Sequence, residues 1–475
     1  MNLDFLLSEV GIKVNFGETE VALVTERIEN VEKGSLFVAV EGESFDGNSF
    51  IDEAFQKGAV AVITEKDIKG DRIIRVKNTR LILSFLCSAF YSHPQYRMKM
   101  IGITGTNGKT TTAHYLKHIL CESGKKSAVI GTLGVNSEEN CVDTGYTTPS
   151  PEVLFRELNA LALREYEYCI MEVSSQALSQ HRVDPIEFEL AVFTNIGSDH
   201  TDYHGSMTKY VNSKSGLFAL AKKSLINTDD AYSDIFEKAA GENIFLYSAH
   251  DKAADYMAKN IRYSENGFSY IVLKNNALER FNTNGVGEFS VYNTLCAIAA
   301  ADILGIPFNF SSSALSILPE VKGRLQKIVS TDKNIYIDFA HTPEALEAVL
   351  KALRSIKPSK LICVFGCGGN RDRSKRSAMG RIAEMYCDKI ILTSDNPRNE
   401  TAENIISDIE CGIRNKKLLS VEKDRAEAIR MAIETAHSDD IVLIAGKGHE
   451  EYQLIGGNKI YYSDVATVKT LLGLI

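Results

Sequence analysis

The chain has 475 residues, too many for a single hydrophobic core, so we expect two to four domains. Its composition is that of a globular protein, and its net charge of −9 gives no bulk attraction to nucleic acid. The nine cysteines form no C-x-x-C pair, which is typical of a reduced cytosolic protein and indicates neither a disulfide framework nor a zinc site. The N-terminal MNLDFLLSEVG is too short an apolar run for a signal peptide, and no stretch is long enough to span a membrane.

The first block of the chain, residues 1–97, contains two strand-like runs. SLFVAV (35–40) and AVAVITE (59–65) lie on either side of a helical stretch at 51–58. The polar segment 91–99 carries a proline and is expected to link this block to the next.

The second block opens on GITGTNGKTTT (102–112). An apolar strand (98–103) precedes this loop and a helical pattern (113–124) follows it. Its glycines allow backbone N–H groups to point at phosphate oxygens, its lysine can reach outer phosphates, and its hydroxyls suit Mg²⁺. The strict pattern G-x-x-x-x-G-K-[ST] requires glycine where this chain has Ile103. A glycine-rich turn without a ligand is the alternative, but the order of strand, loop, lysine and helix favours a phosphate-binding loop.

Three further apolar runs, 127–132, 167–173 and 190–196, alternate with helical segments. This alternation predicts a mostly parallel sheet with helices on both faces, in which ligands bind at the carboxyl ends of the strands. Glu172 ends the second run and either binds Mg²⁺ or is a capping or surface residue.

The loop after the third run is dense in histidines and carboxylates. It predicts a metal site or the polar floor of an active site, with a solvated loop as the alternative; its residues are Thr194, Asn195, Asp199, His200, Asp202 and His204. Lys214 follows in MTKYVNSKSGLF. This stretch alone favours a solvated surface lysine, because burying an unpaired ammonium group is costly.

The third block has strand-like runs at 334–340, 360–366, 388–394 and 440–446, which predict a second doubly wound domain. Each run is followed by polar residues of both charges, as a zwitterionic ligand such as an amino acid requires. These residues are Asp338 and His341; Arg371, Arg373, Lys375 and Arg376; Asp395, Asn396 and Arg398; and Gly446, His449 and Glu450. An ordinary polar loop explains any one cluster, but not all four.

The motifs TGTNGKTTT, MEVSSQALSQHRV, TNIGSDHTDYHG, the lysine of YVNSKSGLF, DFAHTPEAL, GCGGNRDRSKR, SDNPR and AGKGHE occur here in one order. In this the chain resembles the Mur ligase family from about residue 20 to its end, most strongly in the second and third blocks. The family has the same shifted glycine pattern, which accounts for Ile103. The implied fold is α/β with three domains: a UDP-substrate-binding domain (1–97), a central phosphate-loop ATPase-like parallel sheet (98–323), and a C-terminal Rossmann-like doubly wound sheet binding the incoming amino acid (324–475).

The resemblance also implies the reaction, an ATP-dependent amide ligation in cytoplasmic peptidoglycan precursor synthesis. ATP phosphorylates the side-chain carboxylate of D-glutamate in UDP-MurNAc-L-Ala-D-Glu, and the amine of a third amino acid attacks the acyl phosphate. We expect a monomer with no nucleic-acid partner and no membrane span.

Residues of this chain match the family's nucleotide and metal positions. The resemblance implies that Lys109, Glu172, His200 and Lys214 are catalytic, and that Mg²⁺ is held by Thr110, Glu172, His200 and a CO₂-derived carbamate on Lys214. The implied ATP-binding residues are Gly105, Thr106, Asn107, Gly108, Lys109, Thr110, Thr111, Asn293, Arg324, Asp338 and His341. Gln326 replaces the glutamate of the family's G-R-x-E pattern.

A second set matches the contacts of the UDP-sugar peptide. It comprises Glu43, Ser44, Phe45, Tyr146, Thr147, Thr148, Ser174, Gln180 and Arg182. Two departures stand out. Tyr146 replaces an expected asparagine, and Arg27-Ile28-Glu29 stands where the family has D-S-R.

The incoming amino acid is expected to be meso-diaminopimelate, because the family's D-N-P-R motif accompanies that substrate. This ligand has a second carboxylate that lysine lacks, which Arg398 and Arg371 would bind, while Glu450 accepts an ammonium group and Gly446 allows close approach. The implied diaminopimelate residues are Arg371, Asp395, Asn396, Pro397, Arg398, Gly446 and Glu450.

Four alternatives were weighed against this reaction. Two are an L-lysine-adding ligase of the same family and a member adding D-glutamate or D-Ala-D-Ala. The third is a folylpolyglutamate synthetase-like ligase, and the fourth is a phosphate-loop motor or switch. A motor or switch would leave Lys214, the histidine-rich loop and the charged clusters of the third block unexplained.

Overall fold

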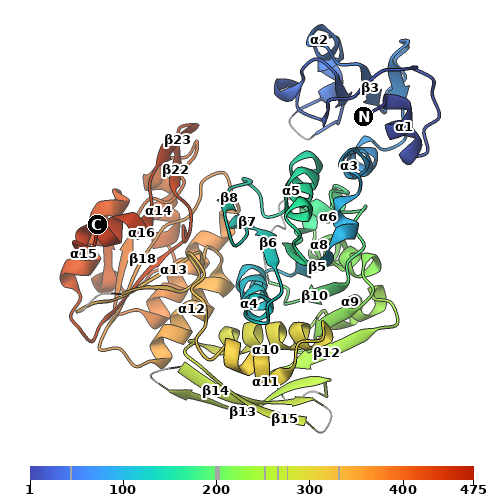
Figure 1. Cartoon of the computed structure of the whole chain (residues 1–475). Coiled ribbons are helices and arrows are strands. Elements are labelled where there is room, and N and C mark those ends of the chain that lie inside the picture. The colour runs from blue at the N-terminus through green and yellow to red at the C-terminus, as the bar shows by residue number, and fades with distance from the viewer. Residues whose placement is uncertain (43–44, 198–203, 251–252, 265–266, 275–276, 330–331) are drawn as a thin grey trace.

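The computed structural model describes residues 1–42, 45–197, 204–250, 253–264, 267–274, 277–329 and 332–475. Its three α/β domains are a small N-terminal domain above a central domain, and a C-terminal domain beside the central one (Figure 1). This is the predicted fold class. None of the described helices is long and apolar enough to cross a membrane.

The N-terminal domain is built on a four-stranded parallel sheet with the order β1-β2-β3-β4. Its α3 packs against α1 of the same domain and against α5 of the central domain. One hydrophobic core therefore runs through both domains. The elements are α1 (Leu3–Glu9), β1 (Leu23–Thr25), β2 (Ser35–Val38), α2 (Ile51–Gln56), β3 (Ala61–Thr64), β4 (Ile73–Arg75) and α3 (Thr79–Phe90).

The central domain has an eleven-stranded sheet with the order β15-β14-β13-β12-β11-β10-β5-β9-β6-β7-β8. Strands β13, β12, β11, β10, β5, β9 and β6 are parallel, and antiparallel strands extend both edges. The strands are β5 (Lys99–Thr104), β6 (Ser127–Gly131), β7 (Gly134–Asn136), β8 (Cys141–Val142), β9 (Tyr168–Glu172), β10 (Leu190–Phe193), β11 (Ser224–Asn227), β12 (Ile244–Ser248), β13 (Tyr256–Ser264), β14 (Gly267–Lys274) and β15 (Ala277–Thr283).

Helices cover both faces of the central sheet. In β9, Cys169 and Met171 enter the core under α5, α8 and α9, and Ile170 enters the core under α4 and α10. Burial on both faces explains why the parallel strands are continuous apolar runs. The helices are α4 (Lys109–Glu122), α5 (Pro151–Leu163), α6 (Ser175–Ser179), α8 (Met207–Ser215), α9 (Ser233–Ala239), α10 (Glu288–Ile303) and α11 (Phe308–Ala314).

The C-terminal sheet has the order β16-β17-β21-β18-β19-β20, all parallel except β16. Helices α12, α13 and α14 cover one face and α15 and α16 the other, as a doubly wound domain requires. The elements are β16 (Gln326–Ile328), β17 (Asn334–Asp338), α12 (Pro343–Ser355), β18 (Leu361–Phe365), α13 (Ser374–Tyr386), β19 (Lys389–Leu392), α14 (Ala402–Glu410), β20 (Leu419–Val421), α15 (Arg425–Thr435), β21 (Ile441–Ala445), β22 (Tyr452–Ile455), β23 (Asn458–Tyr461) and α16 (Asp464–Leu471).

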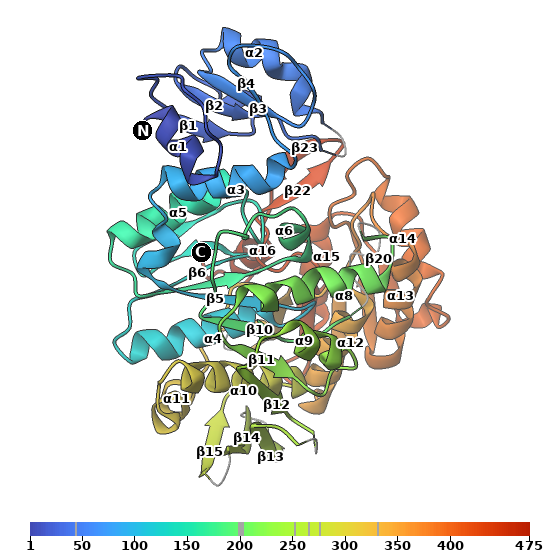
Figure 2. The ribbon, with the colours of Figure 1, turned by 90° about the vertical axis from the view of Figure 1, so that its right-hand side faces the viewer.

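The structure changes some expected boundaries. The helix predicted from residue 113 already begins at Lys109, directly after the glycine-rich loop. The predicted linker 91–99 contains a short 3-10 helix (Pro94–Arg97) that packs against α5, so this segment lies on the central domain. Figure 2 shows α3 and α5 together beneath the N-terminal sheet.

A buried ion pair holds together the strand ends of the C-terminal domain. The Arg425 guanidinium binds the Asp464 carboxylate through two hydrogen bonds of 2.8 Å, and both side chains are almost fully buried. It also donates to the carbonyl oxygens of Ser394 and Ala445, where the loops after β19 and β21 begin.

Asp464→Ala would leave the buried guanidinium without its carboxylate. We expect the variant to lose about 3–5 kcal/mol of stability, measured by urea unfolding of the full chain. Glu434→Ala removes one of the two exposed carboxylate partners of Arg430 and is the control; it should leave the unfolding midpoint unchanged. Equal midpoints for the two variants would contradict the prediction.

Candidate active site

A cavity of about 1380 Å³ lies between the central and C-terminal domains. It brings together most of the residues predicted to bind ATP and Mg²⁺. From the central domain it is lined by Thr106, Asn107, Gly108, Lys109, Thr110, Thr111, Glu172, Lys214 and Asn293, and from the C-terminal side by Arg324, Asp338 and His341.

Two glycines shape the loop at the end of β5. Gly105 has a φ of +143°, and a Cβ there would lie 2.0 Å from the Thr194 Oγ1. Gly108 has a φ of +86°, and its Cβ would lie 2.5 Å from the Asn293 Oδ1. Only glycine fits this conformation and this packing, so the loop follows the β5 end closely.

The loop presents the first turn of α4 to the cavity. The Asn107 N–H donates to the Asn195 Oδ1, and the Asn195 Nδ2 donates back to the Asn107 carbonyl, both at 3.0 Å. The Lys109 Nζ donates to the carbonyls of Gly105 and Thr106 at 2.9 Å. Backbone N–H groups at a helix start, with a lysine beside them, form an anion site suited to phosphate.

Glu172 is buried at the end of β9 beside the loop. Its carboxylate accepts hydrogen bonds from the Thr110 Oγ1 (2.8 Å) and from the N–H (2.8 Å) and Oγ1 (3.1 Å) of Thr132. A Cβ at Gly131 would lie 2.1 Å from this carboxylate, so a glycine is needed there. Hydroxyl and carboxylate oxygens are what Mg²⁺ prefers, and burial excludes the surface interpretation of Glu172. His200, Asp199 and Asp202 lie outside the described residues.

Lys214 is buried, with 2% of the residue exposed. Its Nζ donates to the Gly105 carbonyl at 2.8 Å and lies 4.6 Å from the centre of the Tyr210 ring. The Tyr210 hydroxyl in turn bonds the Thr106 Oγ1 at 3.0 Å. The surface lysine favoured by the local sequence is therefore wrong, because α8 turns the face that carries Tyr210 and Lys214 toward the loop.

Arg324 reaches the loop from the start of the C-terminal domain. Its Nη2 donates to the Thr110 Oγ1 at 3.1 Å, and its guanidinium lies 4.8 Å from the centre of the Phe339 ring. Burial lowers the pKa of Arg324, and the nearby carboxylates of Glu172 and Asp338 oppose that shift. Asp338 holds the turn that carries Arg324, because its carboxylate accepts from the backbone N–H groups of Leu325 (2.6 Å) and Ala340 (2.7 Å).

Gln326, the replacement in the G-R-x-E pattern, also stabilises this turn. Its Oε1 accepts from the Gly323 N–H at 2.9 Å, and its Nε2 donates to the Glu320 carboxylate. A glutamate at 326 would place a second carboxylate there, so the amide suits its neighbour. The His341 Nδ1 bonds the Phe339 carbonyl at 2.8 Å.

A second polar cluster lies at the ends of β19 and β21. The Asn396 Nδ2 donates to the Glu450 Oε2 at 2.9 Å, and the buried Lys447 Nζ donates to the same oxygen at 2.7 Å and to the Asn396 Oδ1 at 3.2 Å. Gly446 has a φ of +110°, and a Cβ there would lie 2.7 Å from the Asp395 Oδ2. The structure thus brings together Asp395, Asn396, Gly446 and Glu450, as predicted.

Two arginines lie beside this cluster on neighbouring loops. A Cβ at Gly368 would lie 2.8 Å from the Arg398 Nη1 and 3.8 Å from the Arg371 Cγ. Burial and the nearby Arg371 lower the pKa of Arg398. The Arg398 guanidinium and the Arg371 Cγ thus both lie near Gly368, and arginine is a side chain well suited to binding a carboxylate.

The other side chains of the basic cluster after β18 have partners within the protein. Arg373 binds Asp408, and Arg376 binds Glu400 and Asp408. Lys375 donates to the His341 carbonyl at 3.0 Å. Carboxylates of the protein therefore already bind the guanidinium groups of Arg373 and Arg376, neither of which is among the residues implied for diaminopimelate.

Comparisons with known proteins agree with this arrangement. Residues 29–91 match the family model described as Mur ligase family, catalytic domain; residues 103–301 match the Mur ligase middle domain; and residues 323–448 match the Mur ligase, glutamate ligase domain. A UDP-N-acetylmuramoyl-L-alanyl-D-glutamate--2,6-diaminopimelate ligase of Aquifex aeolicus is 42% identical over 477 residues, covering 100% of this chain and 96% of the relative. The chain belongs to the Mur ligase family.

Two further comparisons extend along the chain. An identically named ligase of Caldanaerobacter subterraneus subsp. tengcongensis is 42% identical over 444 residues, covering 92% of each chain. A solved structure of a UDP-N-acetylmuramoyl-L-alanyl-D-glutamate--2,6-diaminopimelate ligase superposes with a TM-score of 0.72 at 31% identity, covering 100% of this chain and 99% of that one. The Mur ligase architecture therefore includes all three domains.

The residues that match the family's UDP-substrate contacts form a group next to Glu172. The Thr148 Oγ1 accepts from the Ser174 N–H at 3.0 Å, and the Thr148 carbonyl accepts from the Arg182 Nη1 at 2.6 Å. The Arg182 guanidinium also donates to the Gln180 Oε1 and lies 5.5 Å from the centre of the exposed Tyr146 ring.

The remaining members of that set are less closely grouped. The Thr147 Oγ1 bonds the Thr132 Oγ1 at 3.2 Å, which places it beside Glu172. Phe45 lies on the N-terminal domain, where its exposed ring stacks on Phe50 with centroids 4.9 Å apart. Glu43 and Ser44 lie outside the described residues.

Sequence reasoning missed several residues that shape the site in this Mur ligase. Thr132 was missed because its strand end carries no charge, although a hydroxyl directly after a buried run is a usable signal. Tyr210 is four residues before Lys214, so both lie on one face of α8. Lys447 was passed over within AGKGHE, although a lysine three residues before Glu450 predicts the observed pair.

Proposed function

We propose that this Mur ligase adds meso-2,6-diaminopimelate to the D-glutamate side-chain carboxylate of UDP-MurNAc-L-Ala-D-Glu, in cytoplasmic peptidoglycan precursor synthesis. The observation that carries the proposal is the pair Arg371 and Arg398 beside the Asp395–Glu450 cluster. Two cations next to carboxylates match a ligand that brings two carboxylates and two ammonium groups. The relatives with diaminopimelate in their names support the same substrate.

Each of the three domains is assigned a different substrate. We assign the UDP moiety to residues 1–97, ATP and ligation to residues 98–323, and the incoming amino acid to residues 324–475. The nucleotide cavity is lined by the central and C-terminal domains. Arg324, at the start of the C-terminal domain, therefore brings a positive charge to the phosphate loop. We expect the enzyme to act as a monomer.

The proposed reaction has two steps, phosphoryl transfer and then amide formation. Phosphoryl transfer from ATP to the D-glutamate carboxylate gives an acyl phosphate and ADP, and attack by an amine of diaminopimelate releases phosphate and forms the amide. Lys109 and Arg324 neutralise the charge of the transferred group, and the loop N–H groups hold the remaining phosphates. Thr110 and Glu172, together with His200 as predicted from the sequence, would hold Mg²⁺, which would supply further charge neutralisation.

We propose that Lys214 acts as its carbamate. The Lys214 ammonium first loses a proton, and addition of the resulting neutral amine to CO₂ forms a C–N bond and releases a second proton. The product is an anion that would be able to hold a second Mg²⁺. The position of Lys214 supports this role, because its buried Nζ lies 2.8 Å from the Gly105 carbonyl of the phosphate loop. That His200 helps to hold Mg²⁺ stays a prediction, since this residue lies outside the described ones.

The test is phosphate release from ATP with UDP-MurNAc-L-Ala-D-Glu, comparing meso-diaminopimelate with L-lysine. We expect release with diaminopimelate and at least about 1000-fold less with L-lysine, since a site built for charged partners rejects a ligand that lacks them. Release with L-lysine alone would keep the ligase and overturn the substrate. Nucleotide hydrolysis that needs no UDP-substrate would favour a phosphate-loop motor or switch.

A further inference from the structure

The two arginines of the proposed amino-acid site lie on loops that follow the paired strands β18 and β19. The first loop includes Gly368-Gly369-Asn370-Arg371, and we call residues 368–371 the Arg371 loop. Asn370 has a φ of +52°, and a Cβ at Gly369 would lie 1.9 Å from the Pro397 carbonyl oxygen. The Arg371 loop therefore has a strained backbone pressed against the second loop, and contacts must hold it there.

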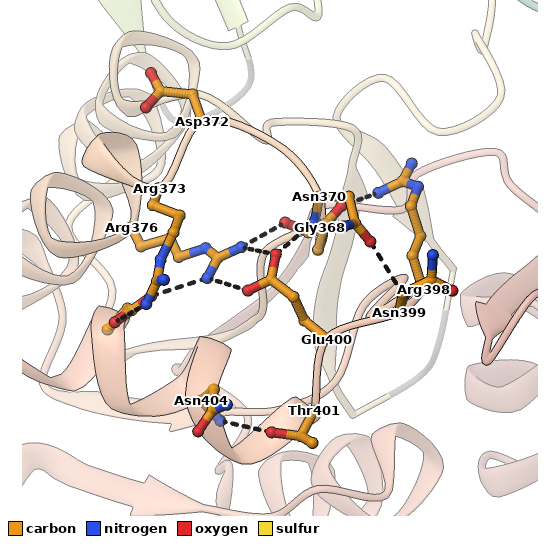
Figure 3. Close-up of polar contacts among 12 residues, drawn as sticks. Gly368, Asn370, Asp372, Arg373, Arg376, Arg398, Asn399, Glu400, Thr401 and Asn404 are labelled. Atoms are coloured by element: carbon orange, nitrogen blue, oxygen red, sulfur yellow. Dashed lines mark hydrogen bonds and ion pairs between the residues drawn. The ribbon is translucent and has the colours of Figure 1, made fainter. Parts of the chain in front are cut away.

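Glu400 provides the central contact, although it is not among the residues that match the family's amino-acid site. Its Oε1 accepts from the Asn370 N–H at 2.5 Å, and its two oxygens accept from the Arg376 Nη1 and Nη2 at 2.9 Å each (Figure 3). The Arg376 Nη2 also donates to the Gly368 carbonyl at 3.3 Å. Glu400 and Arg376 thus hold the Arg371 loop from the side opposite Arg398, as Figure 3 shows.

Other contacts join the two loops directly. The Arg398 Nη1 donates to the Gly369 carbonyl at 2.8 Å, the Gly369 N–H donates to the Asn396 carbonyl at 2.9 Å, and the Asn399 N–H donates to the Asn370 Oδ1 at 3.1 Å. These bonds hold the backbone of residues 369 and 370, directly before Arg371, against the loop that carries Arg398. The spacing of two guanidinium groups decides which arrangement of carboxylates they can bind.

The ion pair between Glu400 and Arg376 is present at neutral pH. Hydrogen bonds from Arg376 and from the Asn370 N–H hold the pKa of Glu400 at about 2, so the carboxylate stays ionised at neutral pH. Arg376 has no exposed side-chain surface, whereas 22% of the Glu400 side chain is exposed. An ion pair with one buried partner is screened little by solvent, which suits a rigid support.

We propose that Glu400, bound to Arg376, is a positioning residue that sets the Arg371–Arg398 spacing and thereby the selectivity for an amino acid with a second carboxylate. The inference rests on the proposed function, because it concerns the amino acid of that same reaction. Glu400 itself touches no reacting atom.

The experiment compares Glu400→Ala and Glu400→Gln with Asp408→Asn in the full-length enzyme. Asp408 binds the same Arg376 at 2.8 Å but has no bond to the Arg371 loop, so it is the matched control. We expect Glu400→Ala to raise the KM for meso-diaminopimelate about tenfold or more, and the KM for ATP and for the UDP-substrate less than about twofold. The preference over L-lysine, as a ratio of kcat/KM, should fall by the same factor.

The control and the conservative variant separate positioning from folding. Asp408→Asn should leave the KM for diaminopimelate within about twofold of the wild type, and Glu400→Gln, which keeps an acceptor, should lie between. Thermal unfolding identifies any variant whose loss is one of folding. Equal changes for all three substrates, or equal changes for Glu400→Ala and Asp408→Asn, would overturn the inference alone. A wild type that releases no phosphate with diaminopimelate would overturn the proposed function and this inference with it.

Discussion

Lys214→Ala is expected to lose about 100- to 1000-fold in ligase turnover while folding like the wild type. The physical reason is position: the buried Lys214 Nζ lies 2.8 Å from the Gly105 carbonyl, at the base of the phosphate loop. A carbamate there would carry negative charge into the metal site, and alanine removes that charge entirely. The measurement is phosphate release at saturating ATP and UDP-substrate.

Rescue distinguishes a carbamate from an ammonium group. Acetate or propionate added to Lys214→Ala should restore part of the activity, because a small carboxylate can take the vacated space, whereas an added alkylamine should not. Lys209→Ala, on the exposed side of α8, is the control and should keep wild-type activity with no response to acetate. Full activity in Lys214→Ala would remove Lys214 from the mechanism.

Local patterns predicted much of the fold and the nucleotide site. The loop, the parallel strands and the polar residues after them were readable because buried strands are continuous apolar runs and ligand groups gather at their carboxyl ends. Strands β13, β14 and β15, which pair antiparallel with one another, were missed, although Phe268, Tyr270 and Val272 of β14 alternate as a half-buried strand requires.

Pairings between distant residues could not be predicted in the same way. Arg376 lies 24 residues from Glu400 and 32 from Asp408. Nothing local indicates that a basic run after β18 is neutralised from the loop before α14 and from α14 itself. The burial of Lys214 could not be predicted from its local sequence either. Its stretch is polar, and burial depends on which face of α8 meets the sheet, which tertiary packing decides.

Arg398→Ala is the second large effect we expect. Its kcat/KM for meso-diaminopimelate should fall by about 100-fold or more, because truncating one partner of a desolvated charge pair costs about 2–5 kcal/mol. The slow reaction with L-lysine should hardly change, because lysine lacks the second carboxylate that we assign to Arg398 and Arg371. The measurement is the ratio of kcat/KM for the two amino acids in one preparation.

The backbone around Arg398 makes this variant interpretable. Its N–H and carbonyl bond Leu454 and Gly456 of the β22–β23 hairpin, and alanine keeps both bonds at the φ of +54°. Arg398→Lys tests the guanidinium itself: a single ammonium keeps the charge but cannot form two parallel bonds, so its preference should lie between wild type and alanine. Arg373→Ala, which removes an exposed arginine bound to Asp408, should keep the wild-type ratio. If Arg373→Ala and Arg398→Ala lowered the ratio equally, general positive charge rather than the Arg371–Arg398 pair would select the amino acid.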